Sequence, residues 1–119
     1  MKTKVLIILI SVMVTSLSCS KRTNEIAQTV ISLEKAALEK WYKGDPSGFY
    51  EIIADDNTYF DPFLEKQLKG KENFIKIMEP IRGTIQAERF EMLNPKVEFN
   101  DNLAILSFNL LFSSCKDLM

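Results

Sequence analysis

Beyond residue 83 the spacing of the apolar residues changes from three or four residues to two, and this change limits the folds that the chain can adopt. Residues 25–43 repeat apolar side chains at helical spacing, on a face formed by Ile26, Val30, Leu33, Ala37 and Trp41. Residues 103–112 alternate instead, with one face formed by Ala104, Leu106, Phe108, Leu110 and Phe112. Helices first and strands later predict an α+β fold, with N-terminal helices packed on one face of an antiparallel sheet.

Shorter elements are marked by the residues that begin and end them. Asp45 and Pro46 open a second predicted helix over residues 46–54, because an acidic cap and an early proline favour a helix start. Residues 58–61 have strand-type side chains, and residues 71–78 fit a third helix. Alternation resumes near residue 90, and residues 100–102 predict the turn before the long final strand.

Size and composition allow one domain and exclude several functions. The chain has 119 residues, enough for one hydrophobic core. Its net charge of −1 gives no field that would attract nucleic acid. It has no histidine and two cysteines, so neither a metal site nor a cofactor is expected.

The first residues have the pattern of an export signal. Lys2 and Lys4 precede an apolar run over residues 5–14, and small or polar residues follow up to Cys19. The run is too short for a helix that crosses a bilayer, which needs about 20 apolar residues. We therefore expect a signal peptide over residues 1–18.

Ser16-Leu17-Ser18-Cys19 resembles the processing site of bacterial lipoproteins, in which the cysteine is lipidated and becomes the N-terminus. The resemblance implies an acylated Cys19 and a tether over residues 19–24, with anchoring in the outer membrane, facing the periplasm. Ordinary signal cleavage or a retained helix are the alternatives. With Cys19 acylated, Cys115 would have no intramolecular partner and would be a small apolar residue.

Three stretches resemble the nuclear transport factor 2-like superfamily, in its SnoaL-like and ketosteroid isomerase-like branches: residues 40–45, 50–62 and 69–74. This resemblance implies a cone-like domain over residues 25–119, in which a curved antiparallel sheet wraps around a pocket and the first helix crosses its mouth. Domains of this kind continue through one or two more strands, so the last strands are expected to be missing. A naturally short chain, completed by a homodimer, and a truncated product remain the two alternatives.

The same resemblance assigns a candidate catalytic residue. In isomerase-like members the general base is the aspartate of the segment that matches residues 59–62, which is Asp61 here. The oxyanion-binding groups do not carry over, because the matching helix position is near Ala37. The alternative is that Asp61 caps the loop after its strand. Tyr42 or Tyr50 is the expected hydrogen-bonding partner if Asp61 lies in a cavity.

Trp41, Tyr59 and Phe63 are candidate ligand-binding residues, with plain core packing as the alternative. A pocket fold without a recognisable catalytic set favours a membrane-anchored periplasmic module that binds a small apolar ligand or a protein partner. The alternative function is an enzyme of the SnoaL or isomerase type with Asp61 as general base.

Overall fold

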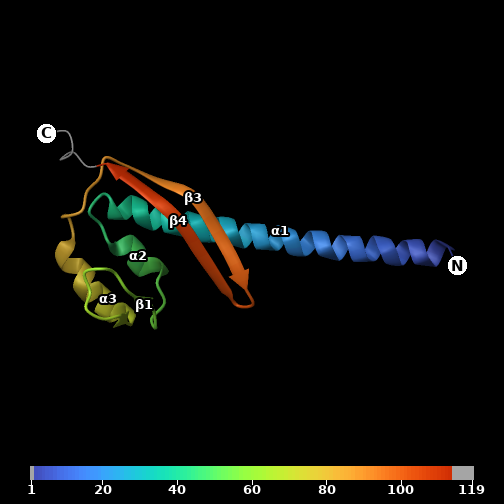
Figure 1. The fold of residues 1–119 in the computed structure, drawn as a ribbon, viewed down its shortest axis with the longest axis horizontal. Coiled ribbons are helices and arrows are strands. Elements are labelled where there is room, and N and C mark those ends of the chain that lie inside the picture. Colours follow the sequence, from blue (N-terminus) through green and yellow to red (C-terminus); the bar gives the residue numbers. More distant parts are fainter. Residues whose placement is uncertain (1, 114–119) are drawn as a thin grey trace.

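The computed structural model describes residues 2–113, with side chains from residue 19 onward. Three helices, a 3₁₀ turn and two antiparallel strand pairs follow one another along the chain (Figure 1). They are α1 (Lys2–Trp41), α2 (Ser47–Ile52), β1 (Thr58–Tyr59), β2 (Leu68–Lys69), α3 (Lys71–Met78), η1 (Glu79–Ile81), β3 (Arg89–Asn100) and β4 (Leu103–Ser113). The α+β class expected from the order of periodicities is confirmed.

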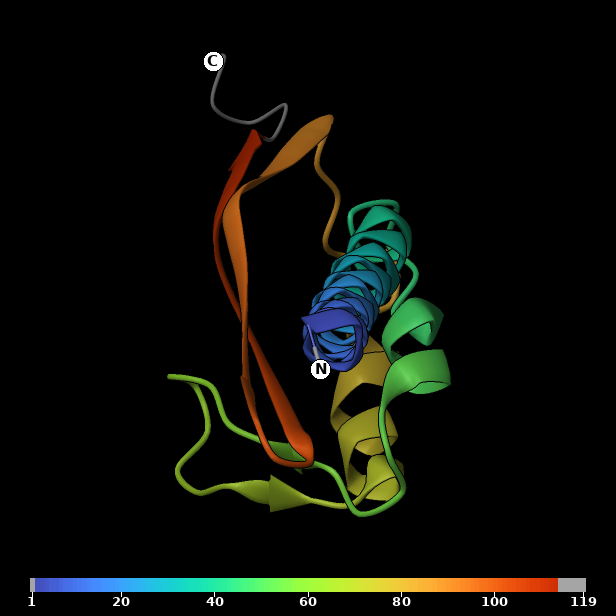
Figure 2. The ribbon, with the colours of Figure 1, turned by 90° about the vertical axis from the view of Figure 1, so that its right-hand side faces the viewer.

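The elements form layers around α1. Seen along α1, the β3–β4 hairpin covers one side of this helix, while α2 and α3 lie on the other side (Figure 2). All three helices therefore lie on the same face of the hairpin. The β1–β2 pair lies at the edge of the assembly, below the tip of the hairpin in the same view.

Helix α1 is longer than predicted at its N-terminal end. The segment expected to hold the lipidated cysteine and the tether, residues 19–24, is helical, and the Thr23 hydroxyl donates to the carbonyl of Cys19 at 3.0 Å, one turn earlier. Among the described residues no helix is both long and apolar enough to cross a membrane. The N-terminal part of α1 extends beyond the other elements (Figure 1).

The predicted apolar face of α1 is correct only near its C-terminal end. Ala37 is buried, but Ile26 and Leu33 are 42% and 48% exposed. The helix packs most closely near its end, where Leu38 and Tyr42 face the core and α2 lies alongside. A periodicity of three and four residues defines a face, but it does not say how far along the helix its neighbours reach.

The hairpin of β3 and β4 supplies the main sheet. The two strands pair from Arg89 opposite Ser113 to Asn100 opposite Leu103. Their register shifts between Leu93 and Lys96, where Asn94 has a φ of 51° and Pro95 follows. A bulge accommodates a proline because proline has no N–H for the ladder. The alternation that the sequence shows from about residue 90 therefore belongs to one bulged strand.

The remaining elements begin and end close to the predicted residues. Helix α3 occupies the expected 71–78, and α2 is shorter than the expected 46–54 because the chain turns extended at Ile53. Strand β1 is limited to two residues, which pair with Leu68 and Lys69 in a strand that the sequence did not predict. A two-residue strand is too short to show alternation.

The core lies between the C-terminal end of α1 and the hairpin. Leu38, Tyr42 and Met92 are its buried centre. The ring of Tyr42 stacks on those of Phe90 and Phe112, which face each other across the hairpin, with centroid distances of 5.2 and 5.5 Å. These contacts fix the hairpin against α1.

Two glycines hold the end of α1 against the loop before β3. Gly44 follows the helix with a φ of +86°, a conformation in which glycine commonly ends a helix. Gly83 N–H donates to the carbonyl of Gly44 at 2.8 Å, and Ala87 N–H donates to that of Tyr42 at 3.0 Å. A Cβ on Gly44 would stand 2.8 Å from the Cα of Gly83, so this approach requires glycine.

Candidate functional site

An apolar cavity of about 420 Å³ lies among the three helices and β1. Its walls come from the end of α1, from α2 and the residue that follows it, from the start of β1 and from α3. The lining residues are Trp41, Phe49, Ile53, Asn57, Thr58, Tyr59, Phe74 and Met78. Six of the eight side chains are aromatic or aliphatic, which is typical of small-molecule sites of this size.

Edge-to-face aromatic pairs shape two walls of the cavity. Trp41 meets Phe49 with centroids 5.8 Å apart and planes at 77°. Tyr59 meets Phe74 at 5.0 Å and 75°. Such pairs are preferred over face-to-face stacking because the positive ring edge meets the negative face. The ring of Trp41 is thereby tied to α2 and that of Tyr59 to α3.

One buried side-chain atom among the lining residues has no hydrogen-bond partner in the protein. The side-chain oxygen of Asn57 is buried and accepts no hydrogen bond. Its backbone is held firmly, because Asn57 N–H donates to Ala54 at 3.1 Å and the Asn57 carbonyl accepts from Gly70 N–H at 2.8 Å. These two hydrogen bonds fix the Cα position of Asn57, from which its side chain extends. No sequence pattern marks Asn57 as a cavity residue, since an asparagine beside two aspartates is typical of a turn.

Asp61 does not line the cavity, but it is bonded to Tyr59, which does. Its carboxylate accepts two hydrogen bonds: one from the Tyr59 hydroxyl at 2.9 Å and one from Phe63 N–H at 2.7 Å. The second bond is an Asx turn that stabilises the loop after β1. Burial, followed by the bond to Asp61 and its negative charge, raises the pKa of Tyr59 to about 12. Tyr59 thus links the cavity wall to the Asp61 carboxylate.

The other predicted site residues are not gathered at one point. Trp41 and Tyr59 both line the cavity, but Phe63 is 94% exposed and does not line it. The expected partners of Asp61 were wrong. Tyr50 donates instead to Glu79, at 3.0 Å, and Tyr42 stacks on the hairpin. The Asp61 partner is Tyr59, two residues earlier in the chain.

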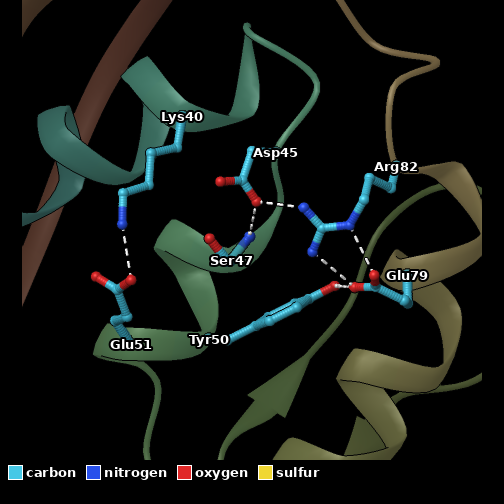
Figure 3. Close-up of polar contacts among 7 residues, drawn as sticks. All are labelled: Lys40, Asp45, Ser47, Tyr50, Glu51, Glu79 and Arg82. Atoms are coloured by element: carbon cyan, nitrogen blue, oxygen red, sulfur yellow. Dashed lines mark hydrogen bonds and ion pairs between the residues drawn. The ribbon is translucent and has the colours of Figure 1, made fainter.

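Outside the cavity, a polar network joins the α1–α2 connection to η1 (Figure 3). The Arg82 guanidinium contacts Asp45 at 2.6 Å and Glu79 at 2.6 Å. Asp45 also accepts from Ser47 N–H at 2.9 Å, and this bond, with Arg82, lowers the pKa of Asp45 to about 2. Burial and the bond to Glu79 raise the pKa of Tyr50 to about 12. The network fixes the position of α2 relative to the end of α3.

The scan against protein-family models finds no match, and the search of curated proteins finds none either. The comparison with solved structures finds a crystal structure from Parabacteroides distasonis ATCC 8503, described as a "putative ketosteroid isomerase". The match has a TM-score of 0.66 and 36% sequence identity, over 76% of this chain and 65% of that chain.

The chain has a ketosteroid isomerase-like fold.

The position of the cavity differs from the one expected of a ketosteroid isomerase-like fold. A curved sheet was expected to wrap around a hollow, but none of the lining residues belongs to β3 or β4. The side of the hairpin that faces α1 is filled by Leu38, Tyr42 and Met92. This cavity therefore lies among the helices, next to β1.

A second carboxylate of this ketosteroid isomerase-like fold is partly withdrawn from water. Glu34 is half-buried on α1, one turn before Leu38, and burial raises the pKa of its carboxyl above the ordinary value. No group of three or more metal-binding side chains occurs within the part of the chain that the structure describes.

Cys19 is the remaining predicted site residue. Its thiol is free and the residue is exposed. It lines a shallow cleft with Thr23 and Ala27 of α1 and with Val97 and Phe99 of β3. The tip of the hairpin is therefore close to Cys19. Cys115 lies outside the described residues.

Proposed function

We propose that this protein is a membrane-anchored module that binds a small apolar ligand in the cavity among α1, α2, α3 and β1. The observation that carries the proposal is the lining of this cavity, which is mainly aromatic and aliphatic. A volume of about 420 Å³ is in the range of small-molecule sites.

The chain contains its own reporter for ligand binding. Trp41 is the only tryptophan and lies in the cavity wall, so its fluorescence should respond to an occupant. Titration with 4-butylanisole, an apolar probe that donates no hydrogen bond, should change the emission of Trp41 in a saturable way. An unchanged emission at the solubility limit of the probe would contradict ligand binding.

A pair of matched variants tests the location. Ile53→Phe adds a ring in the cavity wall and should weaken the binding of 4-butylanisole about tenfold, because it occupies the space of the ligand. Ile26→Phe makes the same change at an exposed position of α1, where it should leave binding unchanged. Equal affinities in the two variants would place the probe elsewhere.

The anchoring part of the proposal is supported by the exposed thiol of Cys19 and by its signal-like preceding segment. Apolar side chains of the hairpin tip, including Phe99 and Leu103, are exposed near the same end of the molecule. Two or more acyl chains are needed for stable attachment, which lipoprotein processing would supply. The proposed location is the periplasmic face of an outer membrane.

Membrane fractionation of the full chain, expressed in a bacterium with an outer membrane, tests the anchor. Cys19→Ala should release the protein from the membrane fraction and abolish incorporation of labelled palmitate. Ser20→Ala, at the adjacent position, should keep both. Retention of the Cys19→Ala protein in the membrane would show that another segment anchors it.

A second candidate function is favoured by one contact. The Tyr59 hydroxyl, on a residue of the cavity wall, lies 2.9 Å from the Asp61 carboxylate, so a general base stands directly behind the wall. In such an enzyme the Tyr59 hydroxyl would take a proton from the substrate or from water while its own proton passes to the Asp61 carboxylate. The name of the Parabacteroides relative is in line with proton transfer next to a carbonyl group.

The test separates catalysis from binding. On the enzymatic alternative, the protein converts 3-cyclohexenone to its conjugated isomer, and Asp61→Asn abolishes this conversion while 4-butylanisole still binds. Absence of conversion by the unchanged protein would leave the binding function alone. A lone base without oxyanion donors lacks the largest contribution to such catalysis, so binding is the function that we favour.

A further inference from the structure

Helices α2 and α3 both contribute walls to the apolar cavity, and they are joined to each other at both ends. Where α2 ends and α3 begins, the joint is made of backbone. Lys71 N–H donates to the carbonyl of Asp55 at 3.0 Å, and Gly70 N–H donates to that of Asn57 at 2.8 Å. This end of the helix pair is therefore held by the main chain.

Where α2 begins and α3 ends, the joint is made of side chains, and Arg82 is its centre (Figure 3). The guanidinium contacts Glu79, the residue after α3, through two nitrogen–oxygen distances of 2.6 and 3.0 Å. Its third nitrogen lies 2.6 Å from the carboxylate of Asp45, which also accepts from Ser47 N–H at the start of α2. A two-point contact between arginine and a carboxylate fixes the direction of both groups better than a single ion pair does.

Tyr50 makes a second connection between the two helices. Its hydroxyl donates to Glu79 at 3.0 Å, and its ring meets that of Phe74, on α3, edge to face with centroids 6.2 Å apart. Phe74 itself lines the cavity and also meets Tyr59. A shift of α2 relative to the end of α3 would therefore change the cavity wall.

The other contacts of α2 fix it to α1 and not to α3. A Cβ on Gly48 would stand 2.9 Å from the Cα of Ala37, so α2 is close-packed on α1. The neighbouring bond from Gly83 N–H to the carbonyl of Gly44 attaches the chain after η1 to the end of α1, and neither glycine belongs to α2 or α3. The end of α3 is thus positioned against α2 mainly by the side chains around Arg82.

We infer that Arg82 is a positioning residue for the ligand site. It holds the start of α2 against the end of α3, and so sets the separation of two cavity walls and the affinity for an apolar ligand. Arg82 does not itself line the cavity, and the inference rests on the proposed binding function. Exposed ion pairs contribute measurably when several charges form a network with two-point geometry, as they do here.

Titration of Trp41 fluorescence with 4-butylanisole tests this role. Arg82→Gln removes both ion pairs and should weaken binding about fivefold. The matched control is Lys96→Gln, which removes the same charge from an exposed pair with Glu98 on β3, outside the cavity lining, and should leave the affinity unchanged. An unchanged affinity of Arg82→Gln would overturn the inference and leave the proposed function intact, because the network would then stabilise the fold alone. Absence of binding by the unchanged protein would overturn both.

Salt separates the charge of Arg82 from the bulk of its side chain. Because 4-butylanisole is uncharged, screening acts only on the protein. At 1 M NaCl, where the screening length is about 3 Å, the fivefold difference between Arg82→Gln and the unchanged protein should fall to about twofold. A difference that persists in full would overturn the role of the ion pairs.

Tyr50→Phe keeps the test decisive if Arg82→Gln does not fold. It removes only the hydroxyl that binds Glu79, keeps the ring against Phe74, and should weaken the binding of 4-butylanisole about twofold. An affinity equal to that of the unchanged protein would contradict the coupling between the network and the cavity.

Discussion

Gly83 donates its backbone N–H to the carbonyl of Gly44 at 2.8 Å, and this contact joins the end of the long helix to the loop that leads into the hairpin. Both glycines have a positive φ, but only Gly44 is tightly enclosed: its missing Cβ would stand 2.8 Å from the Cα of Gly83. An alanine at Gly83 would therefore meet backbone strain alone, whereas an alanine at Gly44 would meet both strain and a steric clash.

We predict that Gly44→Ala destabilises the protein more than Gly83→Ala does. Alanine at Gly83 has open space and should cost only the strain of a positive φ, about 1–2 kcal/mol. Alanine at Gly44 adds a clash with backbone, worth roughly 1–3 kcal/mol more. Urea unfolding of the two variants measures the difference, and equal unfolding free energies would mean that the contact opens without cost.

Asp45 should make the protein sensitive to acid. The bond from Ser47 N–H and the contact with Arg82 lower the pKa of Asp45 to about 2 in the folded state, below the value of about 3.9 for an unfolded chain. A lowered folded-state pKa contributes stability that is present above pH 4 and lost as the pH falls toward 2.

Asp45→Asn should therefore be less stable than the unchanged protein at pH 7, with the difference shrinking as the pH falls from about 4 to about 2. Thermal unfolding followed by circular dichroism at a series of pH values measures this difference. The matched control is Asp101→Asn, in the exposed turn of the hairpin. A difference for Asp45→Asn that does not change with pH would assign the effect to geometry and not to charge.

Ionisation of Tyr59 should make the stability of the protein depend on pH in the alkaline range. Its pKa is raised to about 12 by burial and by Asp61, from an ordinary value of 10. A raised folded-state pKa contributes stability that is complete below pH 10 and lost as the pH rises toward 12. Asp61→Asn removes the negative charge and should lower the pKa of Tyr59, although burial keeps it above the ordinary value.

Phenolate absorbance during alkaline titration measures this change. Glu79→Gln serves as the control, because it should lower the pKa of Tyr50, which is also about 12, and leave that of Tyr59 unchanged. If Asp61→Asn leaves the alkaline titration unaltered, the hydroxyl of Tyr59 does not bind this carboxylate in solution.

Replacement of Tyr42 should show how much the aromatic contact to the hairpin contributes. Tyr42→Ala removes a buried ring that stacks on Phe90 and Phe112, and should cost about 3–5 kcal/mol. Phe112→Ala removes an exposed ring from the same stack and should cost less, on the order of 1 kcal/mol. Guanidinium unfolding measures the loss of unfolding free energy in both variants. A larger loss for Phe112→Ala than for Tyr42→Ala would mean that the Phe112 ring, at the end of β4, contributes more to the core than the Tyr42 ring does.

The sequence predicted elements well where one physical signal was strong. The alternation over residues 103–112 corresponds to β4, and the helix predicted over residues 71–78 corresponds to α3. The prediction was weaker where a tertiary contact decides the structure. Ile26 and Leu33 share the helical spacing of Ala37, but the elements that cover the end of α1 leave them exposed.

The candidate site was predictable only in part. Aromatic character indicated Trp41 and Tyr59, which the structure brings to one cavity, and it equally indicated Phe63, which is exposed. Asn57 had no distinguishing pattern, because an unpaired acceptor is a property of the folded environment. The bond between Tyr59 and Asp61 depends on which side of an extended segment each side chain occupies, and two strand residues are too few to fix this by alternation.

Trp41 and Tyr42 are adjacent in the chain, yet one belongs to the cavity wall and the other is stacked against the hairpin. Neighbouring residues at the end of α1 therefore contact the proposed ligand, through Trp41, and the β3–β4 hairpin, through Tyr42. A ligand in the cavity would stabilise the folded state as a whole, so amide hydrogens of β3 and β4 that exchange by global unfolding should exchange more slowly with solvent. The amide hydrogens of the two strands would thus be protected by a ligand, although no residue of either strand lines the cavity.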